Sequence, residues 1–239
     1  KGHRRAQAIL VCNRESMASL PARWKSKAEF FPVNGISTED LQYSQGDGKS
    51  GDKFRVLSAG TLIRVKGFAL AIKSFARFAE RHPGSSFTII GNGPELSHLE
   101  ETIRRYNLED QVHLEQAIPR KELLDAMASF DVFLFPSLRD GGGAVVVEAM
   151  SAGKPVICLD NGGPGMHITQ ECGLKLIPRS ATAAVDDLAQ ALEKLYTDTE
   201  LRQRLGRAGR VRAEKEYHWD KLGGRLNEIY LNCLFGAAD

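Results

Sequence analysis

The chain has 239 residues, 42% of them hydrophobic and 26% charged, and its formal net charge is +2 at pH 7. These values are ordinary for a globular protein with a sizeable core, and the length suits one α/β domain or one and a half. The balanced charge argues against a nucleic-acid partner. No apolar run approaches the roughly 18–20 residues that span a bilayer.

The spacing of the cysteines and the identity of the first residue give expectations about metal binding and cellular compartment. None of the cysteines has the C-x-x-C or His-paired spacing of a zinc site, so no metal is expected. They are Cys12, Cys158, Cys172 and Cys233. We expect reduced, mostly buried thiols in a cytoplasmic protein. Lys1 is not a natural first residue, so we expect a fragment and leave an upstream targeting segment open.

The first part of the chain predicts short, mixed elements. Residues 8–12 predict a strand, residues 15–24 a helix that Asn13 can cap, and residues 29–33 an extended segment. A polar, glycine-rich surface loop is predicted at residues 44–53.

A P-loop is excluded within that polar loop. It contains Gly48-Lys49-Ser50, but Tyr43 stands where the pattern needs its first glycine, and no strand precedes it.

From residue 54 onward, strands and helices alternate. The predicted strands are residues 54–58, 87–90, 112–114, 130–135, 156–159 and 174–177. The predicted helices are residues 68–81, 95–106, 119–129, 144–152, 184–196, 199–217 and 221–234, the last with Asp220 as its cap. This alternation predicts an α/β fold with a doubly wound parallel sheet, whose ligands bind at the carboxyl ends of the strands.

The stretch from Pro136 to Gly163 combines a glycine turn with two carboxylates. Three glycines, Gly141, Gly142 and Gly143, separate a predicted strand from a predicted helix. Backbone N–H groups at such a turn can approach an anion closely, and the helix dipole favours negative charge there.

Asp140 precedes the glycines and Glu148 lies within the helix. We interpret both as acceptors of hydrogen bonds from sugar hydroxyls, as acids are for the ribose in other nucleotide folds. Glu148 stands in an otherwise apolar run, where a charge needs a partner such as a ligand hydroxyl or a backbone amide.

This stretch resembles the signature of retaining glycosyltransferase family 4. The resemblance rests on Asp140, seven residues, Glu148, then AMSAGKPVI and the turn at Gly162-Gly163, although the family pattern usually begins with Glu. Members have the GT-B fold, in which two Rossmann-like domains face each other across a cleft. The resemblance covers about residues 29–239. It implies a remnant of the preceding domain and the hinge at 1–43, the polar loop at 44–53 and the C-terminal donor-binding domain at 54–239.

The resemblance also implies a cation pair for the donor diphosphate. The family carries an Arg, four residues and then a Lys; here Lys66 matches, but Thr61 stands at the Arg position. Arg64 lies nearby in the sequence and is one replacement for it. Thr61 offers one hydroxyl where an Arg offers a charged fork.

Two further turns match walls of the family's donor site. Gly91 opens a G-x-G-P-E turn after a predicted strand; a plain tight turn is an equally good interpretation. The NAD fingerprint fails there because Leu96 replaces the third glycine. Ile118 lies where the family's backbone lines the nucleobase, and Gln116 replaces a usual Gly beside it.

The resemblance therefore implies a hexosyltransferase-type enzyme that uses a UDP-, GDP- or ADP-linked sugar, retains anomeric configuration, and needs neither cofactor nor metal. Lys66 and Asp140 are the catalytic candidates. The donor-binding candidates are Thr61, Arg64, Gly91, Ile118, Gly141, Gly142, Gly143, Ala144 and Glu148. A sugar, glycan or lipid-linked acceptor is expected to bind mainly to the missing N-terminal domain, so the fragment alone is expected to be inactive. Two alternatives stay open: a noncatalytic nucleotide-binding module, and the less favoured NAD-dependent oxidoreductase.

Five arginines between positions 202 and 212 make one helix basic. They are Arg202, Arg204, Arg207, Arg210 and Arg212. We predict a solvated face, with peripheral membrane contact as the minority interpretation.

Overall fold

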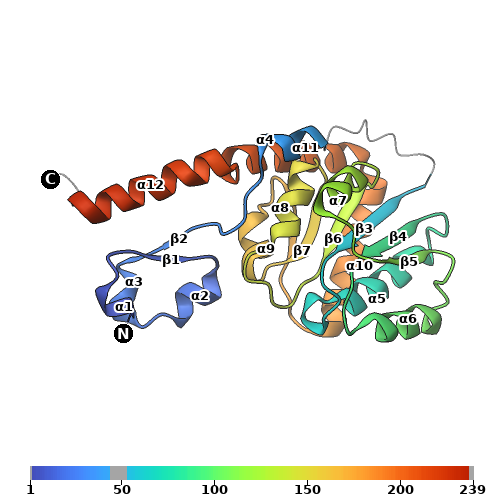
Figure 1. Cartoon of the computed structure of the whole chain (residues 1–239). Coiled ribbons are helices and arrows are strands. Elements are labelled where there is room, and N and C mark those ends of the chain that lie inside the picture. The colour runs from blue at the N-terminus through green and yellow to red at the C-terminus, as the bar shows by residue number, and fades with distance from the viewer. Residues whose placement is uncertain (1, 44–52, 237–239) are drawn as a thin grey trace.

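The computed structural model describes residues 2–43 and 53–236 of the chain (Figure 1). The predicted loop at 44–53, with Gly48-Lys49-Ser50, lies outside the described residues apart from Lys53. The described part consists of a six-stranded sheet domain, a small N-terminal segment with a two-stranded sheet, and a long C-terminal helix that runs from the first toward the second.

The large sheet is parallel throughout, with the strand order β5-β4-β3-β6-β7-β8. Its strands are β3 (Arg55–Ala59), β4 (Ser86–Ile90), β5 (Val112–Glu115), β6 (Val132–Phe135), β7 (Val156–Leu159) and β8 (Gly173–Leu176). The central strand β3 pairs with β4 on one side and with β6 on the other, Leu57 facing Thr88 and Phe133. The chain reverses its direction of travel across the sheet there, so the β3–β6 boundary is the switch point at which such folds bind ligands.

Helices cover both faces of this sheet (Figure 1). The helices α5 (Phe68–Ala79), α6 (Leu96–Arg105) and α10 (Ala181–Thr197) contribute to one buried cluster. The helices α7 (Arg120–Met127) and α8 (Ala144–Ser151) contribute to a second cluster on the other face. The helix α11 (Thr199–Glu216) supplies a residue to each cluster, so it closes one edge of the sandwich.

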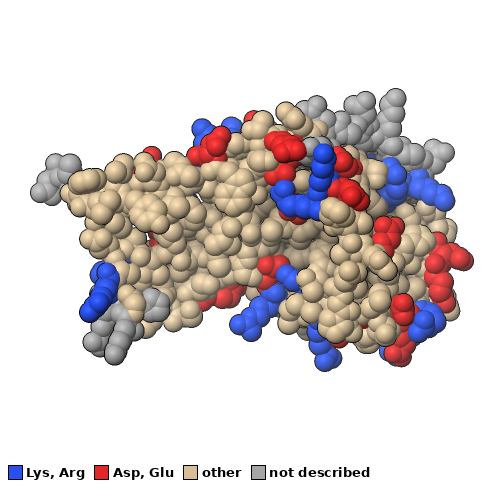
Figure 2. Space-filling model, viewed as in Figure 1, with Lys and Arg blue, Asp and Glu red and all other residues tan. Residues whose placement is uncertain are grey.

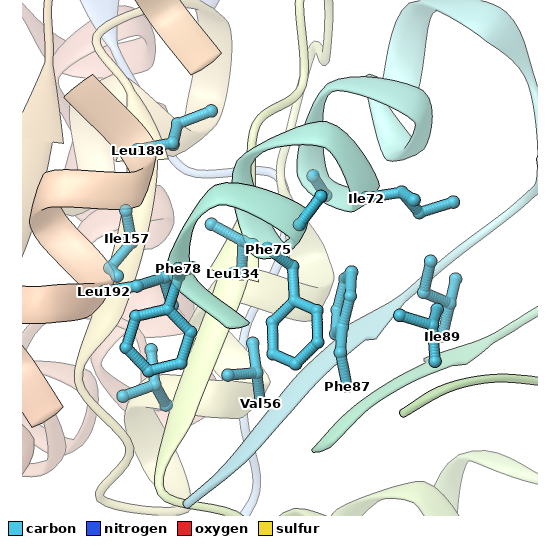
Figure 3. Close-up of a cluster of buried hydrophobic side chains, with 14 of the residues drawn as sticks. Val56, Ile72, Phe75, Phe78, Phe87, Ile89, Leu134, Ile157, Leu188 and Leu192 are labelled. Carbon is cyan, nitrogen blue, oxygen red and sulfur yellow. The ribbon is translucent and has the colours of Figure 1, made fainter. Parts of the chain in front are cut away.

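The first cluster is rich in aromatic side chains (Figure 3). Phe75 and Phe78 of α5 point toward Val56 of β3 and Phe87 of β4, and all four are fully buried. The ring centroids of Phe75 and Phe87 lie 5.4 Å apart. Burial of side chains of this size stabilises a fold by about 1.5–3 kcal/mol each, so this cluster fixes α5 against β3 and β4.

The N-terminal segment contains α1 (Gly2–Arg5), β1 (Ile9–Val11), α2 (Arg14–Ser19), α3 (Ala22–Lys25) and β2 (Ala28–Phe30). The strands β1 and β2 pair in parallel. The long helix α12 (Trp219–Phe235) reaches this segment, and Arg225 contacts Glu29 at 3.4 Å and the carbonyl of Phe30. The segment is therefore tied to the C-terminal end of the described chain.

The chain passes between the two regions twice, and the crossings are hydrogen-bonded to each other. The Ile36 N–H donates to the Tyr217 carbonyl at 2.9 Å, and the Trp219 N–H donates to the Ile36 carbonyl at 3.0 Å. Ile36 is fully buried, and the short helix α4 (Thr38–Tyr43) follows it. The first crossing is thus fixed against the sheet domain at the start of α4.

Charged side chains are distributed unevenly over the view of Figure 2, where they gather over the sheet domain and are sparse over α12. Trp219, Tyr230, Leu231, Leu234 and Phe235 of α12 are exposed apolar residues. Within the described residues, none of the helices has the length and apolar character to cross a membrane.

The predicted fold class is confirmed, and the predicted bounds of the elements after residue 53 differ from those observed by no more than three residues. The prediction of one helix over residues 15–24 is wrong, because Pro21 separates α2 from α3 and a proline disrupts a helix interior. Asn13 caps α2 as predicted, its side chain accepting from the Ser16 N–H at 2.8 Å. The cap of α12 is His218 rather than Asp220, since the His218 ring accepts from the Asp220 N–H.

Candidate functional site

A pocket of about 470 Å³ opens where the switch point predicts it. Its walls come from the loops after β3, β4 and β5 and from the N-terminal half of α8. The sequence-predicted residues Thr61, Gly91, Ile118, Ala144 and Glu148 all line it. The structure therefore brings together residues that span 88 positions of the chain, from 61 to 148.

The loops after β3 and β4 pack so closely that Gly91 is required at one wall. A Cβ atom at this position would lie 2.0 Å from the carbonyl oxygen of Gly60. Asn92, the next residue, accepts from the Ala117 N–H at 3.1 Å through its side-chain oxygen. This bond braces the segment that carries Ile118 against the β4 turn.

The N-terminus of α8 supplies free amides at the pocket. Gly143 is the N-cap with φ of 64° and contributes no side-chain cap. The N–H groups of Ala144 and Val145, in the first turn, have no hydrogen-bond partner among the described residues. Both residues line the pocket, so this end offers N–H donors and a helix dipole to an anion.

The glycine amides at positions 142 and 143 are not available in the same way. Asp140 Oδ1 accepts from the Gly142 N–H at 3.1 Å and from the Gly143 N–H at 2.8 Å. A short Asp side chain can bond to its own backbone two or three residues on, as it does here. Asp140 therefore occupies the two amides that were expected to face the ligand, and the donors without a partner among the described residues are those of the next two residues, Ala144 and Val145.

Lys66 is bonded to the second oxygen of Asp140. It ends the 3₁₀ turn η1 (Arg64–Lys66), which packs on the loop after β6 through a bond from the Leu138 N–H to the Val65 carbonyl at 2.8 Å. The Lys66 side chain is 20% exposed and that of Asp140 is 12% exposed. The two catalytic candidates thus form a half-buried ion pair beside the N-terminus of α8.

Arg64 does not join this pair. It lines a different hollow, of about 480 Å³, with Lys73 and His98. Arg64 and Lys66 stand at the two ends of one 3₁₀ turn, and only Lys66 is bonded to the turn before α8. Thr61 lines the pocket and Arg64 lines the other hollow, so Arg64 does not supply the cation that Thr61 lacks.

Glu148 has a partner that the sequence did not reveal. Arg120, at the start of α7, donates from Nε to Glu148 Oε1 at 2.6 Å and from Nη1 to Asp40 Oδ1 at 2.6 Å. The expected partner was a ligand hydroxyl or a backbone amide; the cation of Arg120 fills this need within the protein. The hydrogen bond to Asp40 raises the pKa of Arg120, and burial of the guanidinium lowers that pKa to a smaller extent. Burial of Asp40 raises its pKa, but the bonds from Arg120 and Ser37 together leave it below its ordinary value.

A second hollow, of about 440 Å³, borders Asp140 and Gly141 on the side of the N-terminal segment. Short polar side chains line it, among them Asn13 and Ser16 of the α2 start. Asn13 donates to the Gly141 carbonyl at 2.9 Å. Asp140 therefore stands between the pocket at α8 and a polar space that faces the N-terminal segment.

His167 is hydrogen-bonded to the glycine turn at Gly142. The residue is 3% exposed and lies at the end of α9 (Gly162–His167). A neutral imidazole satisfies both neighbours when Nε2–H donates to the Gly142 carbonyl and Nδ1 accepts from the Tyr217 hydroxyl at 3.0 Å. Burial lowers the pKa of His167, which favours this neutral form.

The basic helix is not simply a solvated face. Arg210 donates to the Ser151 carbonyl at 2.8 Å and to the Leu41 carbonyl at 2.7 Å, and Arg212 donates to the His167 carbonyl at 2.9 Å. Arg202 likewise donates to the Leu195 carbonyl at 2.6 Å. The prediction is wrong for these three residues because the long Arg side chain reaches carbonyls near the ends of neighbouring helices. Arg204 and Arg207 are exposed, as predicted. Among the described residues, no group of three or more His, Cys, Asp or Glu could hold a metal ion.

A family model described as "Glycosyl transferases group 1" matches residues 41–212. That is more than half of the 239 residues. The chain belongs to this family. The resemblance to GT-B glycosyltransferases is confirmed, whereas family 4 and retention of configuration are finer assignments.

Relatives of this glycosyl transferase chain include enzymes that are named for different activities. The glycogen synthase of Mycobacterium tuberculosis is 27% identical over 204 residues, covering 85% of this chain and 48% of the relative. The gpi3 subunit of phosphatidylinositol N-acetylglucosaminyltransferase from Schizosaccharomyces pombe is 29% identical over 197 residues, covering 82% and 42%. The chain spans about half the length of the curated relatives it matches.

Solved structures share the fold over nearly the whole chain. The pneumococcal O-GlcNAc transferase GtfA, in complex with UDP and GlcNAc, superposes with a TM-score of 0.79 at 20% identity, covering 98% of this chain and 46% of that one. Sucrose-phosphate synthase from Thermosynechococcus elongatus superposes with a TM-score of 0.78 at 25% identity, covering 98% and 60%.

Proposed function

We propose that this chain is the donor-binding domain of a retaining, hexosyltransferase-type glycosyltransferase of family 4. The pocket at the β3–β6 switch point takes the nucleoside diphosphate part of an NDP-sugar, linked to UDP, GDP or ADP. No metal or cofactor takes part in the proposed reaction. The acceptor, a sugar, glycan or lipid-linked molecule, binds mainly to residues beyond this chain. We therefore propose that the chain alone binds the donor without transferring its sugar.

One observation carries this proposal. A single pocket is lined by the carboxylate of Glu148 and by two residues, Ala144 and Val145, whose N–H groups have no partner among the described residues. Carboxylates accept from ribose hydroxyls, and helix N-termini bind phosphates. The same pocket thus offers both kinds of group that a nucleoside diphosphate needs, in the fold position where such ligands bind.

The chemistry follows from charge. As the sugar leaves, negative charge builds on the diphosphate, and prearranged donors stabilise it. Lys66 and the free amides of α8 supply these donors. Asp140 borders the polar hollow and orients the sugar, and its bond to Lys66 holds the ammonium beside the α8 N-terminus. Retention of configuration and membership of family 4 rest on the resemblance of the stretch from Asp140 to Gly163.

A second candidate is a noncatalytic nucleotide-binding module. Thr61 favours it, because this position lacks the cation that would help to stabilise the departing diphosphate. Both candidates predict nucleotide binding. They differ in whether sugar transfer appears when the rest of the protein is present.

A thermal-shift screen of the full 239-residue chain tests the proposal. UDP, GDP, ADP and NAD are compared at millimolar concentration. Ligand at ten times its Kd stabilises by about 1.4 kcal/mol, which is a rise of roughly 3–6 °C in Tm for a domain of this size. We expect such a rise with at least one nucleoside diphosphate and none with NAD. A rise with NAD alone would contradict the proposal.

A further inference from the structure

Arg120 joins the pocket to the first chain crossing, and neither the family resemblance nor the sequence patterns gave it a role. We propose that Arg120 is a positioning residue for the donor ribose: held by Asp40 of α4, it turns the Glu148 carboxylate toward the hydroxyls of the bound nucleotide. The inference rests on the proposed function, because it needs a ribose in this pocket.

The geometry fixes the guanidinium in one plane. Nη1 and Nη2 donate to the two oxygens of Asp40 at 2.6 and 3.0 Å, a fork-to-fork arrangement that restricts rotation. This leaves Nε to donate to Glu148 Oε1 at 2.6 Å. Glu148 Oε2 has no bond to the described residues, and Glu148 lines the pocket. One carboxylate oxygen is therefore held, and the other is available to a hydroxyl group.

The Asp40 side chain is itself held in place by hydrogen bonds at the start of α4. The Ser37 N–H donates to Asp40 Oδ2 at 2.7 Å, and the Asp40 N–H donates to Ser37 Oγ at 3.2 Å. This reciprocal pair is a capping box at the start of α4. It follows directly after Ile36, whose backbone is bonded to the second chain crossing. Arg120 thus transmits the position of the crossing segment to Glu148.

The burial of Glu148 argues against a purely structural ion pair. Its side chain is 11% exposed, and it shares the Arg120 guanidinium with Asp40. A buried carboxylate is costly unless hydrogen-bond donors reach its oxygens. Glu148 lines the pocket, where the hydroxyl groups of a ribose would supply donors to its second oxygen.

The test compares a nucleotide with and without its ribose hydroxyls. UDP and 2′,3′-dideoxy-UDP are titrated calorimetrically into the full chain, with GDP and ADP pairs in parallel. The variants are Arg120→Gln, Arg120→Lys, Asp40→Asn and Glu148→Gln. Arg105→Gln is the matched control, because Arg105 pairs with Glu101 on the exposed surface of α6 at 2.9 Å.

We expect the parent to bind the ribonucleotide about 10-fold or more tightly than the dideoxynucleotide, which is the effect on Kd of hydrogen bonds to a charged group. Arg120→Gln should reduce this preference several-fold while leaving the Kd of the dideoxynucleotide nearly unchanged. Asp40→Asn should act in the same direction with a smaller effect, and Arg120→Lys should restore part of the preference. Adding Arg120→Gln to Glu148→Gln should cause no further loss of the preference for the ribonucleotide, because both residues act through the Glu148 carboxylate.

Several outcomes would overturn the inference. Equal weakening of both ligands would assign Arg120 a structural role or a direct contact with base or phosphate. Tighter ribonucleotide binding by Arg120→Gln would mean that Arg120 competes with the ribose. Should Arg120→Gln fail to fold, an unchanged preference in Asp40→Asn and Arg120→Lys would be equally decisive. The proposed function fails separately, if the parent binds none of the diphosphates.

Discussion

Two carboxylates, each paired with a cation, stand on either side of the α8 N-terminus, and they differ in how they are held. Asp140 bonds to amides of its own turn and to Lys66, all within the two loops that meet at the switch point. Glu148 bonds to Arg120, which Asp40 anchors from the first chain crossing. The proposed phosphate side is thus organised locally, whereas the proposed ribose side depends on α4 and the crossing segment before it.

The two carboxylates should respond differently to changes in the residues around them. The Asp140 turn keeps two backbone bonds when Lys66 is removed, so its shape should survive such a change. Glu148 is held by one side chain, and its orientation should therefore respond to distant changes in α4. The predictions below test this difference, beginning with the strongest effect.

Lys66→Ala should weaken binding of UDP by up to about 100-fold, because a charged donor to the diphosphate is lost and Thr61 offers no charge in its place. Uridine should bind as in the parent. Paired titrations with UDP and uridine measure this selectivity. Lys73→Ala is the control, since Lys73 lines the neighbouring hollow with Arg64. Equal losses for UDP and uridine would remove Lys66 from the phosphate side.

Glu148→Ala should weaken binding of UDP by about 10-fold. This is the lower end of the effect expected for a hydrogen bond to a charged group, since the Glu148 oxygens are shared between Arg120 and the ligand. The fold should be retained, because Arg120 keeps Asp40 as a partner. Calorimetry gives the Kd and far-UV circular dichroism the fold. Parent-like Kd values for UDP, GDP and ADP would show that Glu148 is no ribose ligand, and unfolding would make its role structural.

The two sides were predictable to different degrees, and the reason is physical. Asp140, Lys66 and the glycine turn belong to a strand-turn-helix pattern that is visible in consecutive residues. The need of Glu148 for a partner was also visible, as a charge in an apolar helix. The identity of that partner was not. Arg120 is 80 positions from Asp40 and 28 from Glu148, and no periodicity links them.

Other misses have similar causes. Arg64 and Lys66 are two positions apart, so sequence proximity placed both at the diphosphate. A 3₁₀ turn instead directs Arg64 into a separate hollow, while Lys66 bonds to Asp140. The amides of Gly142 and Gly143 were expected to face an anion, and the anion they bind is Asp140. Strand order and helix faces, in contrast, follow from the alternation of short apolar runs and amphipathic stretches.

Thr61→Arg should tighten UDP binding several-fold by adding a second cation at the phosphate side, within the ~1.5–3 kcal/mol of a charged hydrogen bond. Thr61 lines the pocket, and its side chain has no hydrogen bond to the described residues, so the substitution breaks no such bond. The same titration measures the gain. An unchanged Kd would mean that the diphosphate lies too far from Thr61 for an Arg to reach it.

The smallest effect concerns His167 and pH. Its folded-state pKa is lowered by burial, so below about pH 6.5 the unfolded chain binds a proton that the folded chain excludes. Stability should therefore fall as pH drops below that value. His167→Gln should flatten this part of the denaturation profile, and His113→Gln, at an exposed position of β5, should leave it unchanged. A profile equally steep in both variants would contradict the buried, neutral imidazole.

The central claim is that one pocket holds a nucleoside diphosphate with its ribose at Glu148 and its phosphates at the α8 N-terminus. A crystal structure of the chain with UDP measures this directly. We predict ribose hydroxyls at about 2.6–3.2 Å from the Glu148 carboxylate, and phosphate oxygens at the same range from the Ala144 and Val145 amides or Lys66 Nζ. UDP bound in the hollow of Arg64 and Lys73, or with its ribose turned away from Glu148, would contradict the account.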